Sequence, residues 1–311
     1  MMVSAVLLLL GALTAVVAPR WLGRAAWPER EPVVALWVWQ CAVAGVLLCL
    51  GLSMLLSAAT AWQAVRGRLF APAPHGVAEA YGPVTGGPWA AGTAVVLAGG
   101  AVWTGAMLTR EVLRARARRR ARRSELLVRA PLLPGEDPGP VRLVLLEGER
   151  PGAWWVPGAA PQLVVTTAAL NRLKGRQLDA VLAHEQGHAV ARHEWLLNCA
   201  RALSGAFPQV RVFAAFRDEM HHLVELAADD VASRRFGRLT TALALVGLNE
   251  DRGVFGPYAP PEAHVPQRVT RLLAATPRLS PGHRLGLTAA AALVPALPLL
   301  VAFGPGLTAL T

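Results

Sequence analysis

Cysteine and lysine are both scarce in this chain of 311 residues, which has three cysteines and a single lysine, Lys174. Three cysteines without close-paired spacing exclude a disulfide framework and a cysteine-ligated zinc knuckle. We therefore expect Cys41, Cys49 and Cys199 to pack as small apolar side chains. The near-absence of lysine reflects compositional bias and indicates no mechanism.

Charged residues are missing from four long apolar segments, and 54% of the chain is hydrophobic. Each segment approaches the ~20 residues that cross the hydrocarbon core of a bilayer. We predict four transmembrane helices, at about 1–18, 33–62, 89–108 and 285–303, the last followed by a short tail to residue 311. No lysine or arginine precedes the first apolar stretch, so we interpret it as a retained anchor and not as a cleaved signal peptide.

The arginines indicate how these spans are oriented. Eight arginines lie between Arg110 and Arg123, directly after the third span, whereas the loop from 63 to 88 contains only two. Because basic loops stay on the cytosolic side, residues 109–284 are predicted to be cytosolic and both termini to lie outside. The expected location is the plasma membrane, with several passes.

The net charge of +11 is compatible with binding to nucleic acid or to an anionic membrane. Much of it falls between Arg110 and Arg123, beside a span, where anionic lipid headgroups are the nearest partner. We expect contact with the bilayer and no direct nucleic-acid binding; self-association into a homo-oligomer is left open. The DNA-binding alternative requires a soluble 109–284 fragment that shifts duplex DNA in a salt-sensitive way.

The region between the last two spans is predicted to fold as a domain. Residues 109–140 combine a basic juxtamembrane helix with a proline- and glycine-rich linker, and residues 141–284 form the domain itself. Its expected strands are 141–146, 153–156 and 162–166, and its expected helices are 167–173, 176–193, 194–216 (broken near Pro208), 218–235 and 239–248. Strands followed by helices indicate an α+β domain inserted into an α-helical membrane protein.

The pattern His184-Glu185-Gln186-Gly187-His188 carries the most chemistry. On a helix, positions i and i+4 lie on one face, so both imidazoles can reach one metal ion. The residues before it are good helix formers with apolar positions at helical spacing. Glu185 is then placed to take a proton from a metal-bound water.

A catalytic zinc site usually has three protein ligands and one open position. Glu225 is our candidate third ligand, on a helix that can fold back against the first. Asp229, one turn later, is expected to accept a hydrogen bond from a ligand histidine and to fix its tautomer. The alternative is that Glu225 and Asp229 belong to a solvated acidic helix face.

The short strand 153–156 is bounded by glycine and proline. In H-E-x-x-H proteases the substrate usually lies extended along an edge strand beside the metal, and this strand fits that role. Trp154 and Trp155 would then lie near the substrate. They fit equally well as core or membrane-interface aromatics.

The segment from Gln177 to His188, together with Glu225-Leu226-Ala227-Ala228-Asp229, resembles the gluzincin membrane metallopeptidases. Two groups compete: the BlaR/MecR-type antirepressor peptidases, and the HtpX and CAAX-prenyl-protease type. Three spans, a domain and a fourth span look like the first group. So does the short stretch between His188 and Glu225, which has no room for the apolar hairpin common in the second.

The resemblance implies a zincin-like metalloprotease domain with one Zn²⁺ per chain. His184, His188 and Glu225 would be zinc ligands, Glu185 the general base for a zinc-activated water, and Asp229 their support. His264 and Arg268 resemble a basic position that can contact the substrate or transition state, although Arg268 also fits an ordinary surface arginine. The chain departs from the BlaR receptors because its tail has no room for a β-lactam sensor.

The resulting hypothesis is a membrane zinc metalloendopeptidase that cleaves cytosolic or membrane-proximal proteins, including a transcriptional repressor or itself. His221, His222 or His264 could assist as a proton donor, whereas His193, rotated off the ligand face, is assigned a structural role. The alternatives are an HtpX-like quality-control protease and a non-enzymatic membrane signalling protein with a vestigial metal site.

Overall fold

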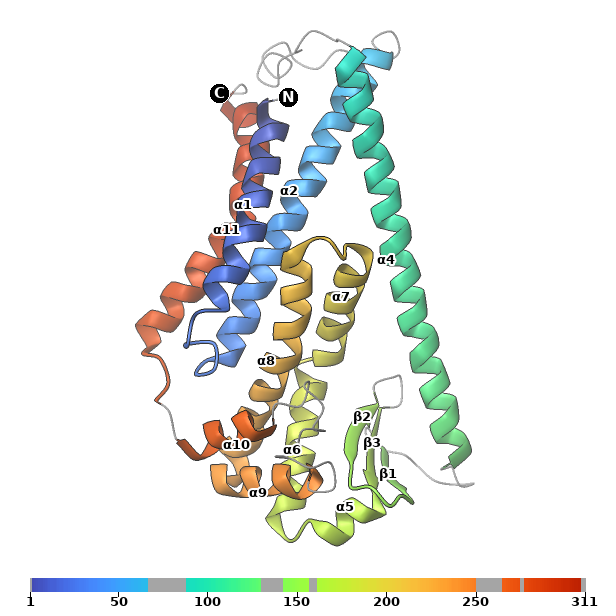
Figure 1. Cartoon of the computed structure of the whole chain (residues 1–311), viewed down its shortest axis with the longest axis vertical. Coiled ribbons are helices and arrows are strands. Elements are labelled where there is room, and N and C mark those ends of the chain that lie inside the picture. The colour runs from blue at the N-terminus through green and yellow to red at the C-terminus, as the bar shows by residue number, and fades with distance from the viewer. Residues whose placement is uncertain are drawn as a thin grey trace.

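Four long helices and a smaller α/β part make up the chain in the computed structural model, which describes residues 2–66, 88–129, 142–156, 161–249, 265–274 and 277–308 (Figure 1). The long helices are α1 (Met2–Leu22), α2 (Pro32–Arg66), α4 (Pro88–Arg129) and α11 (Pro281–Thr308). The start of α1 and the end of α11 lie at the same end of the molecule, and the sheet lies at the other.

Three helices in the described part of the chain are long and apolar enough to cross a membrane: Met2–Leu22, Pro32–Ala58 and Pro281–Gly304. They correspond to the first, second and fourth predicted spans, and they indicate a membrane protein. Glycines bring them close together, since a Cβ on Gly45 would lie 2.8 Å from Cγ1 of Val294 on α11. The third predicted span, 89–108, forms the first half of α4 and stays a prediction as a span.

The helix α4 continues without a break for 42 residues, as the sequence predicts for a span that extends into a basic helix. Its second half carries exposed arginines at 110, 114, 116, 118 and 120. Ala115 is buried on the face that packs against α7 (His193–Ala206).

The sheet has three strands in the order β1 (Arg142–Leu146), β3 (Gln162–Thr166) and β2 (Ala153–Val156). β1 runs parallel to β3 and β2 runs antiparallel to it. The bounds of β2 and β3 agree with the prediction; for β1 residues 142–146 are strand, and residue 141 of its predicted range lies outside the described residues. β2 is therefore an edge strand, and it lies against α6 (Arg176–Val190).

The remaining helices are α5 (Thr167–Arg172), α8 (Arg211–Phe236), α9 (Arg238–Asn249) and α10 (Val265–Ala274). The prediction that the site helix runs to residue 193 is wrong. It ends at Val190, because Arg192 adopts a left-handed conformation with φ of 52° and redirects the chain into α7. The predicted helix from 218 begins earlier, at Arg211, and α10 was not predicted.

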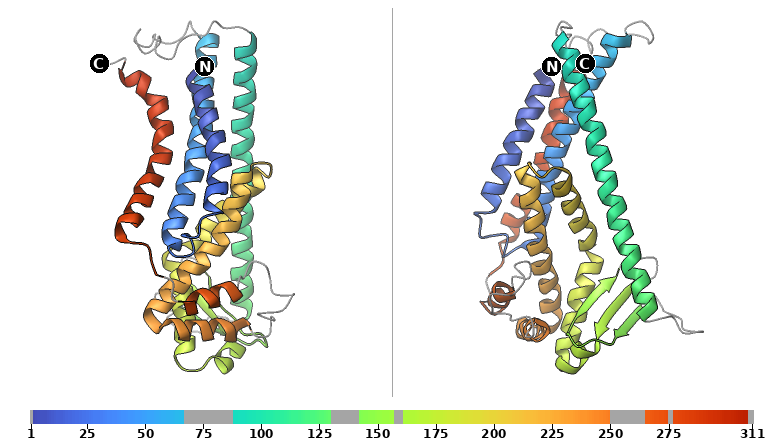
Figure 2. Two further views of the ribbon diagram at one scale, coloured as in Figure 1. Left: turned by 60° about the vertical axis from the view of Figure 1, so that its left-hand side comes forward. Right: turned by 45° about the vertical axis from the view of Figure 1, so that its right-hand side comes forward.

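Helices α7 and α8 form a hairpin that packs between α2 and α4 (Figure 2). Apolar side chains of the hairpin and of the long helices share one core, in which the rings of Trp39 and Phe216 lie 6.3 Å apart. The expectation that the stretch between His188 and Glu225 has no room for an apolar hairpin is therefore wrong. Helix α8 therefore connects the part with the sheet and α6 to the apolar helices, because its side chains share a core with those of α2.

Candidate metal centre

The two helices that carry the site, α6 and α8, approach each other closely at Gly187. A Cβ at this position would lie 3.3 Å from Cβ of Val231 and 3.4 Å from Cα of Ala228. Contacts this tight would force the neighbouring atoms to give by a few tenths of an ångström if a side chain were present. The glycine inside the H-E-x-x-H pattern thus sets the distance between the histidines on α6 and the acidic residues on α8.

Two imidazoles and one carboxylate converge between these helices. The Nε2 atoms of His184 and His188 lie 3.1 Å apart. Oε2 of Glu225 is 3.5 Å from Nε2 of His184, and its Oε1 is 3.4 Å from Nε2 of His188. Each of the three residues offers one ligand atom, and these atoms lie close enough together to hold a metal ion.

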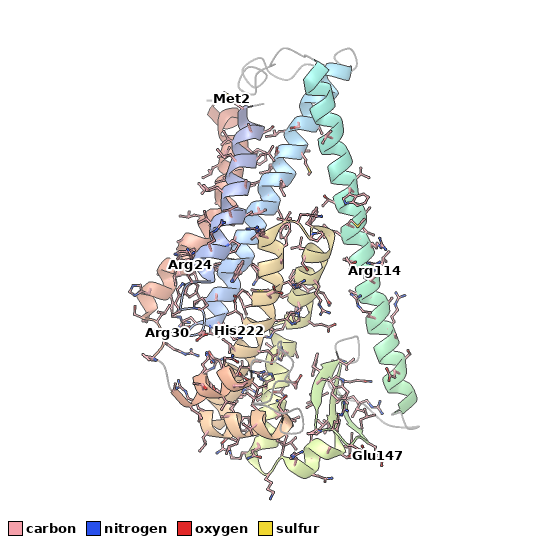
Figure 3. The ribbon with its side chains drawn as sticks, in the orientation of Figure 1. Met2, Arg24, Arg30, Arg114, Glu147 and His222 are labelled. Carbon is pink, nitrogen blue, oxygen red and sulfur yellow. The ribbon has the colours of Figure 1, made fainter. Side chains whose placement is uncertain are left out.

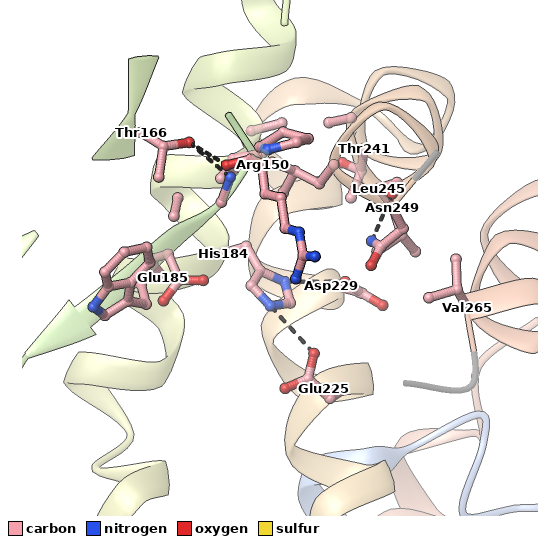
Figure 4. Close-up of a pocket in the computed structure, with 18 of the residues that line it drawn as sticks. Arg150, Thr166, His184, Glu185, Glu225, Asp229, Thr241, Leu245, Asn249 and Val265 are labelled. Atoms are coloured by element: carbon pink, nitrogen blue, oxygen red, sulfur yellow. Dashed lines mark hydrogen bonds and ion pairs between the residues drawn. The ribbon is translucent and has the colours of Figure 1, made fainter. Parts of the chain in front are cut away.

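The second nitrogen of each histidine is also held by a neighbour (Figure 4 shows the His184 side). Nδ1 of His184 lies 3.0 Å from Oδ1 of Asp229, and Nδ1 of His188 lies 3.0 Å from Nδ1 of His193. The Asp229 carboxylate accepts from Nδ1 of His184 and so favours the tautomer that leaves Nε2 of His184 free to bind metal. Asp229 is almost fully buried, so the alternative of a solvated acidic face is wrong for it, and His193 contacts a candidate ligand.

Arg268 on α10 is buried beside the two carboxylates, so its interpretation as an ordinary surface arginine is wrong. Its Nε and Nη2 donate to the two carboxylate oxygens of Asp229 at 2.8 and 2.7 Å. Its Nη1 lies 2.7 Å from Oε2 of Glu225. One guanidinium thus fixes both Glu225 and Asp229, and it binds Asp229 in the bidentate arrangement that arginine favours.

Glu185 faces the same space from α6, and the edge strand orients it. The backbone N–H of Trp155 on β2 donates to Oε2 of Glu185 at 3.0 Å. Burial raises the pKa of Glu185 to about 7, although the neighbouring His184 and the Trp155 N–H oppose the shift. A carboxylate with a pKa near neutrality can both accept and return a proton.

The carboxyl groups of Glu225, the candidate acidic ligand, and of Asp229 are held in their ionised form. Burial alone would raise the pKa of Glu225 and of Asp229, but the charge of Arg268 and contacts with His184 outweigh it, and the pKa of both carboxyls is lowered. Burial lowers the pKa of His188 to about 3, which keeps that ring neutral. Burial also favours the neutral form of His184, yet hydrogen bonds to Asp229 and Glu225 raise its pKa to about 10.

A cavity of about 880 Å³ opens onto this cluster. Glu185, His184, Glu225, Asp229 and Arg268 line one side of it. Other walls come from the β1–β2 connection and from α9 and α10, with Leu146, Ala244, Leu245, Leu248 and Val265 among the apolar residues. The volume is in the range of binding sites for small molecules or short peptide segments.

The other sequence candidates have mixed outcomes. Trp154 lines the cavity but its side chain is 37% exposed, so it is no core residue, and Trp155 serves through its backbone. His221 lines the cavity; His222 lies one residue further along α8 (Figure 3). His264 lies outside the described residues. The structural role predicted for His193 agrees with its contact to His188, whereas sequence reasoning missed the role of Gly187, although it stands in the pattern.

Two imidazoles and a carboxylate, with the carboxylate of Glu185 beside them, are a set of side chains suited to a catalytic metal ion. Residues 114–248 match the model of Peptidase family M48. This match supports a metallopeptidase of that family, and it includes every candidate ligand. No curated protein and no solved structure gives a significant match to the chain.

A Gly187→Ala variant tests the helix contact. Its Cβ must displace Val231 or separate α6 from α8. We expect this overpacking to lower the free energy of unfolding by about 1–3 kcal/mol and hence to lower the melting temperature. The better helix propensity of alanine offsets only part of the loss. The control is Gly286→Ala on α11, where a Cβ meets nothing within 4 Å. Thermal unfolding in detergent measures both variants, and equal melting temperatures would contradict the close contact.

Proposed function

We propose that this chain is a membrane-embedded zinc metalloendopeptidase whose ligands are His184, His188 and Glu225. The observation that carries the proposal is the convergence of these side chains: the two Nε2 atoms lie 3.1 Å apart, Oε1 of Glu225 lies 3.4 Å from that of His188, and Oε2 lies 3.5 Å from that of His184. A tetrahedral zinc site with bonds of about 2.0–2.1 Å has ligand atoms roughly 3.3 Å apart, so the donor set fits this ion. The match to Peptidase family M48 supports the same reaction class.

A zinc ion held by three protein ligands supplies Lewis acidity, which polarises a peptide carbonyl and acidifies water. Glu185 is the general base: it accepts the proton of the attacking water and then passes it to the leaving nitrogen. Its raised pKa suits both steps. Asp229 and His193 hold the two ligand imidazoles, and Arg268 holds Asp229 and Glu225 in place.

The edge strand β2 is our proposed binding site for the substrate backbone. Gly152 accepts a hydrogen bond from the N–H of Thr166, on the side facing β3. Because antiparallel strands alternate inward and outward backbone groups, those of Ala153 and Trp155 face away from β3. The N–H of Trp155 bonds to Glu185, and the substrate would use the Ala153 groups and the Trp155 carbonyl. An extended substrate can pair there, directly beside Glu185, with its side chains reaching the apolar wall of the cavity.

The substrate class follows from the layout. The chain would lie in the plasma membrane with residues 109–284 on the cytosolic side. The cavity would then bind cytosolic or membrane-proximal proteins for cleavage, including a repressor or the chain itself. We favour the BlaR-like role on the order of the spans, and the HtpX-like role is the second candidate because α7 and α8 do form a hairpin. Exposed arginines of α4, beginning at Arg110, would contact anionic headgroups. Self-association into a homo-oligomer is a further part of the proposal.

An N-terminal proteomic comparison of cells with wild-type and Glu185→Gln protein tests the function. We expect new protein N-termini that occur only with the wild type, because the variant lacks the general base. These termini would name the cleaved bonds and separate a repressor from membrane substrates. Identical termini in both samples, despite bound zinc, would instead favour the non-enzymatic signalling protein.

A further inference from the structure

Asp230, the residue after Asp229, belongs to a second group of charges that the proposed reaction does not use. Its carboxylate is largely buried, and Nη2 of Arg271 lies 2.8 Å from its Oδ1. Arg278 lies 2.9 Å from the other oxygen, Oδ2. The two side chains differ in setting, because Arg271 on α10 is only 12% exposed whereas Arg278 is 44% exposed.

Arg271 also reaches the segment between the first two long helices. Its Nε donates to the backbone carbonyl of Glu29 at 2.6 Å. One guanidinium therefore joins three parts of the chain: α10, the acidic middle of α8, and the turn that connects α1 to α2. We call Asp230, Arg271 and the Glu29 carbonyl the α10 clasp.

Helix α10 packs mainly against α9, and two of its arginines bond to carboxylates of α8. Its apolar side, with Val265 and Val269, packs against Leu245 of α9. The buried face of α10 also includes Arg268 and Leu272, and Arg271 lies three residues after Arg268 and hence close to it on the helix surface. Arg268 bonds to Glu225 and Asp229, and Arg271 bonds to Asp230. The position of Arg268 against the candidate ligand thus depends on where the clasp holds α10.

We propose that Arg271 is a positioning residue of the metal centre. By bonding Asp230 and the Glu29 carbonyl, it holds α10 so that Arg268 stays on Glu225 and Asp229. The clasp also links the metal site to the turn between α1 and α2. This role rests on the proposed zinc site and deepens it.

The test compares Arg271→Gln with Arg278→Gln in the full chain in detergent. Both variants remove a cation from the same carboxylate, but only the first removes it from α10. We expect Arg271→Gln to weaken zinc affinity, measured against a chromophoric chelator, by about 10-fold. Hydrogen exchange of residues 265–274 should become about 10-fold faster, as for the loss of one charge-assisted hydrogen bond.

Arg278→Gln should leave zinc affinity and exchange of α10 within about twofold of wild type. Adding Asp230→Asn to Arg271→Gln should not weaken zinc affinity further, because the bond of Asp230 to α10 is already lost in the single variant. Equal values for the two arginine variants, or unchanged exchange of α10 in Arg271→Gln, would overturn the positioning role. A wild type that binds zinc but cleaves no protein defeats the proposed function and leaves the role decided by these readouts, whereas a wild type that binds no zinc defeats both.

Discussion

Replacing Glu185 by glutamine is expected to lower kcat for cleavage of fluorescent casein by about 10²- to 10⁴-fold, the contribution of a positioned general base. Glutamine has nearly the same shape, and its amide oxygen can still accept the Trp155 N–H bond that holds Glu185 at 3.0 Å. The variant should therefore keep its fold and its zinc. Kinetics and metal analysis of the purified full chain measure the two quantities separately.

The neighbouring Gln186 provides a matched control for this variant. Its side chain is exposed and accepts a hydrogen bond from Arg235 at 3.1 Å, away from the ligands. Gln186→Ala should retain kcat within about twofold, since surface changes of this kind have small effects. If Glu185→Gln kept kcat within tenfold of wild type while binding zinc, Glu185 would not be the base.

Local spacing explains why the ligands could be predicted from the sequence. The i, i+4 separation of His184 and His188 fixes a common face once the segment is helical, and Glu225 with Asp229 repeats this separation on the second helix. The helix prediction follows from good helix formers at apolar spacing. The sequence prediction therefore names the same three residues, His184, His188 and Glu225, that the structure places within reach of one metal ion.

Contacts between distant segments could not be predicted in the same way. Arg268 and Arg271 lie about forty residues beyond their partners on α8, and nothing in their spacing shows that α10 folds back onto α8. The break after Val190 depends on a left-handed Arg192, a conformation that its residue type does not favour. The packing of the α7–α8 hairpin against α2 and α4 likewise arises from tertiary contacts, and it ties the site to the apolar helices.

The buried arginine of the site leads to the largest expected loss of stability. The side chain of Arg268 is 6% exposed and bonds to two carboxylates of α8. Arg268→Met keeps much of the side-chain volume but leaves Asp229 buried without its cation. Breaking a buried ion pair from one side costs about 3–5 kcal/mol, so we expect a decrease of that size in the free energy of unfolding of the metal-free protein, followed by tryptophan fluorescence in detergent.

Two further variants separate the charge of Arg268 from its shape. Arg268→Lys keeps the charge and loses the two-pronged geometry, so it should recover only part of the stability. Adding Asp229→Asn to Arg268→Met removes the stranded negative charge, and the double variant should be less destabilised than the sum of the single changes. A loss below about 1 kcal/mol in Arg268→Met would contradict the interpretation of Arg268 as a buried residue that fixes the candidate third ligand, Glu225. A loss that small is typical of an exposed ion pair.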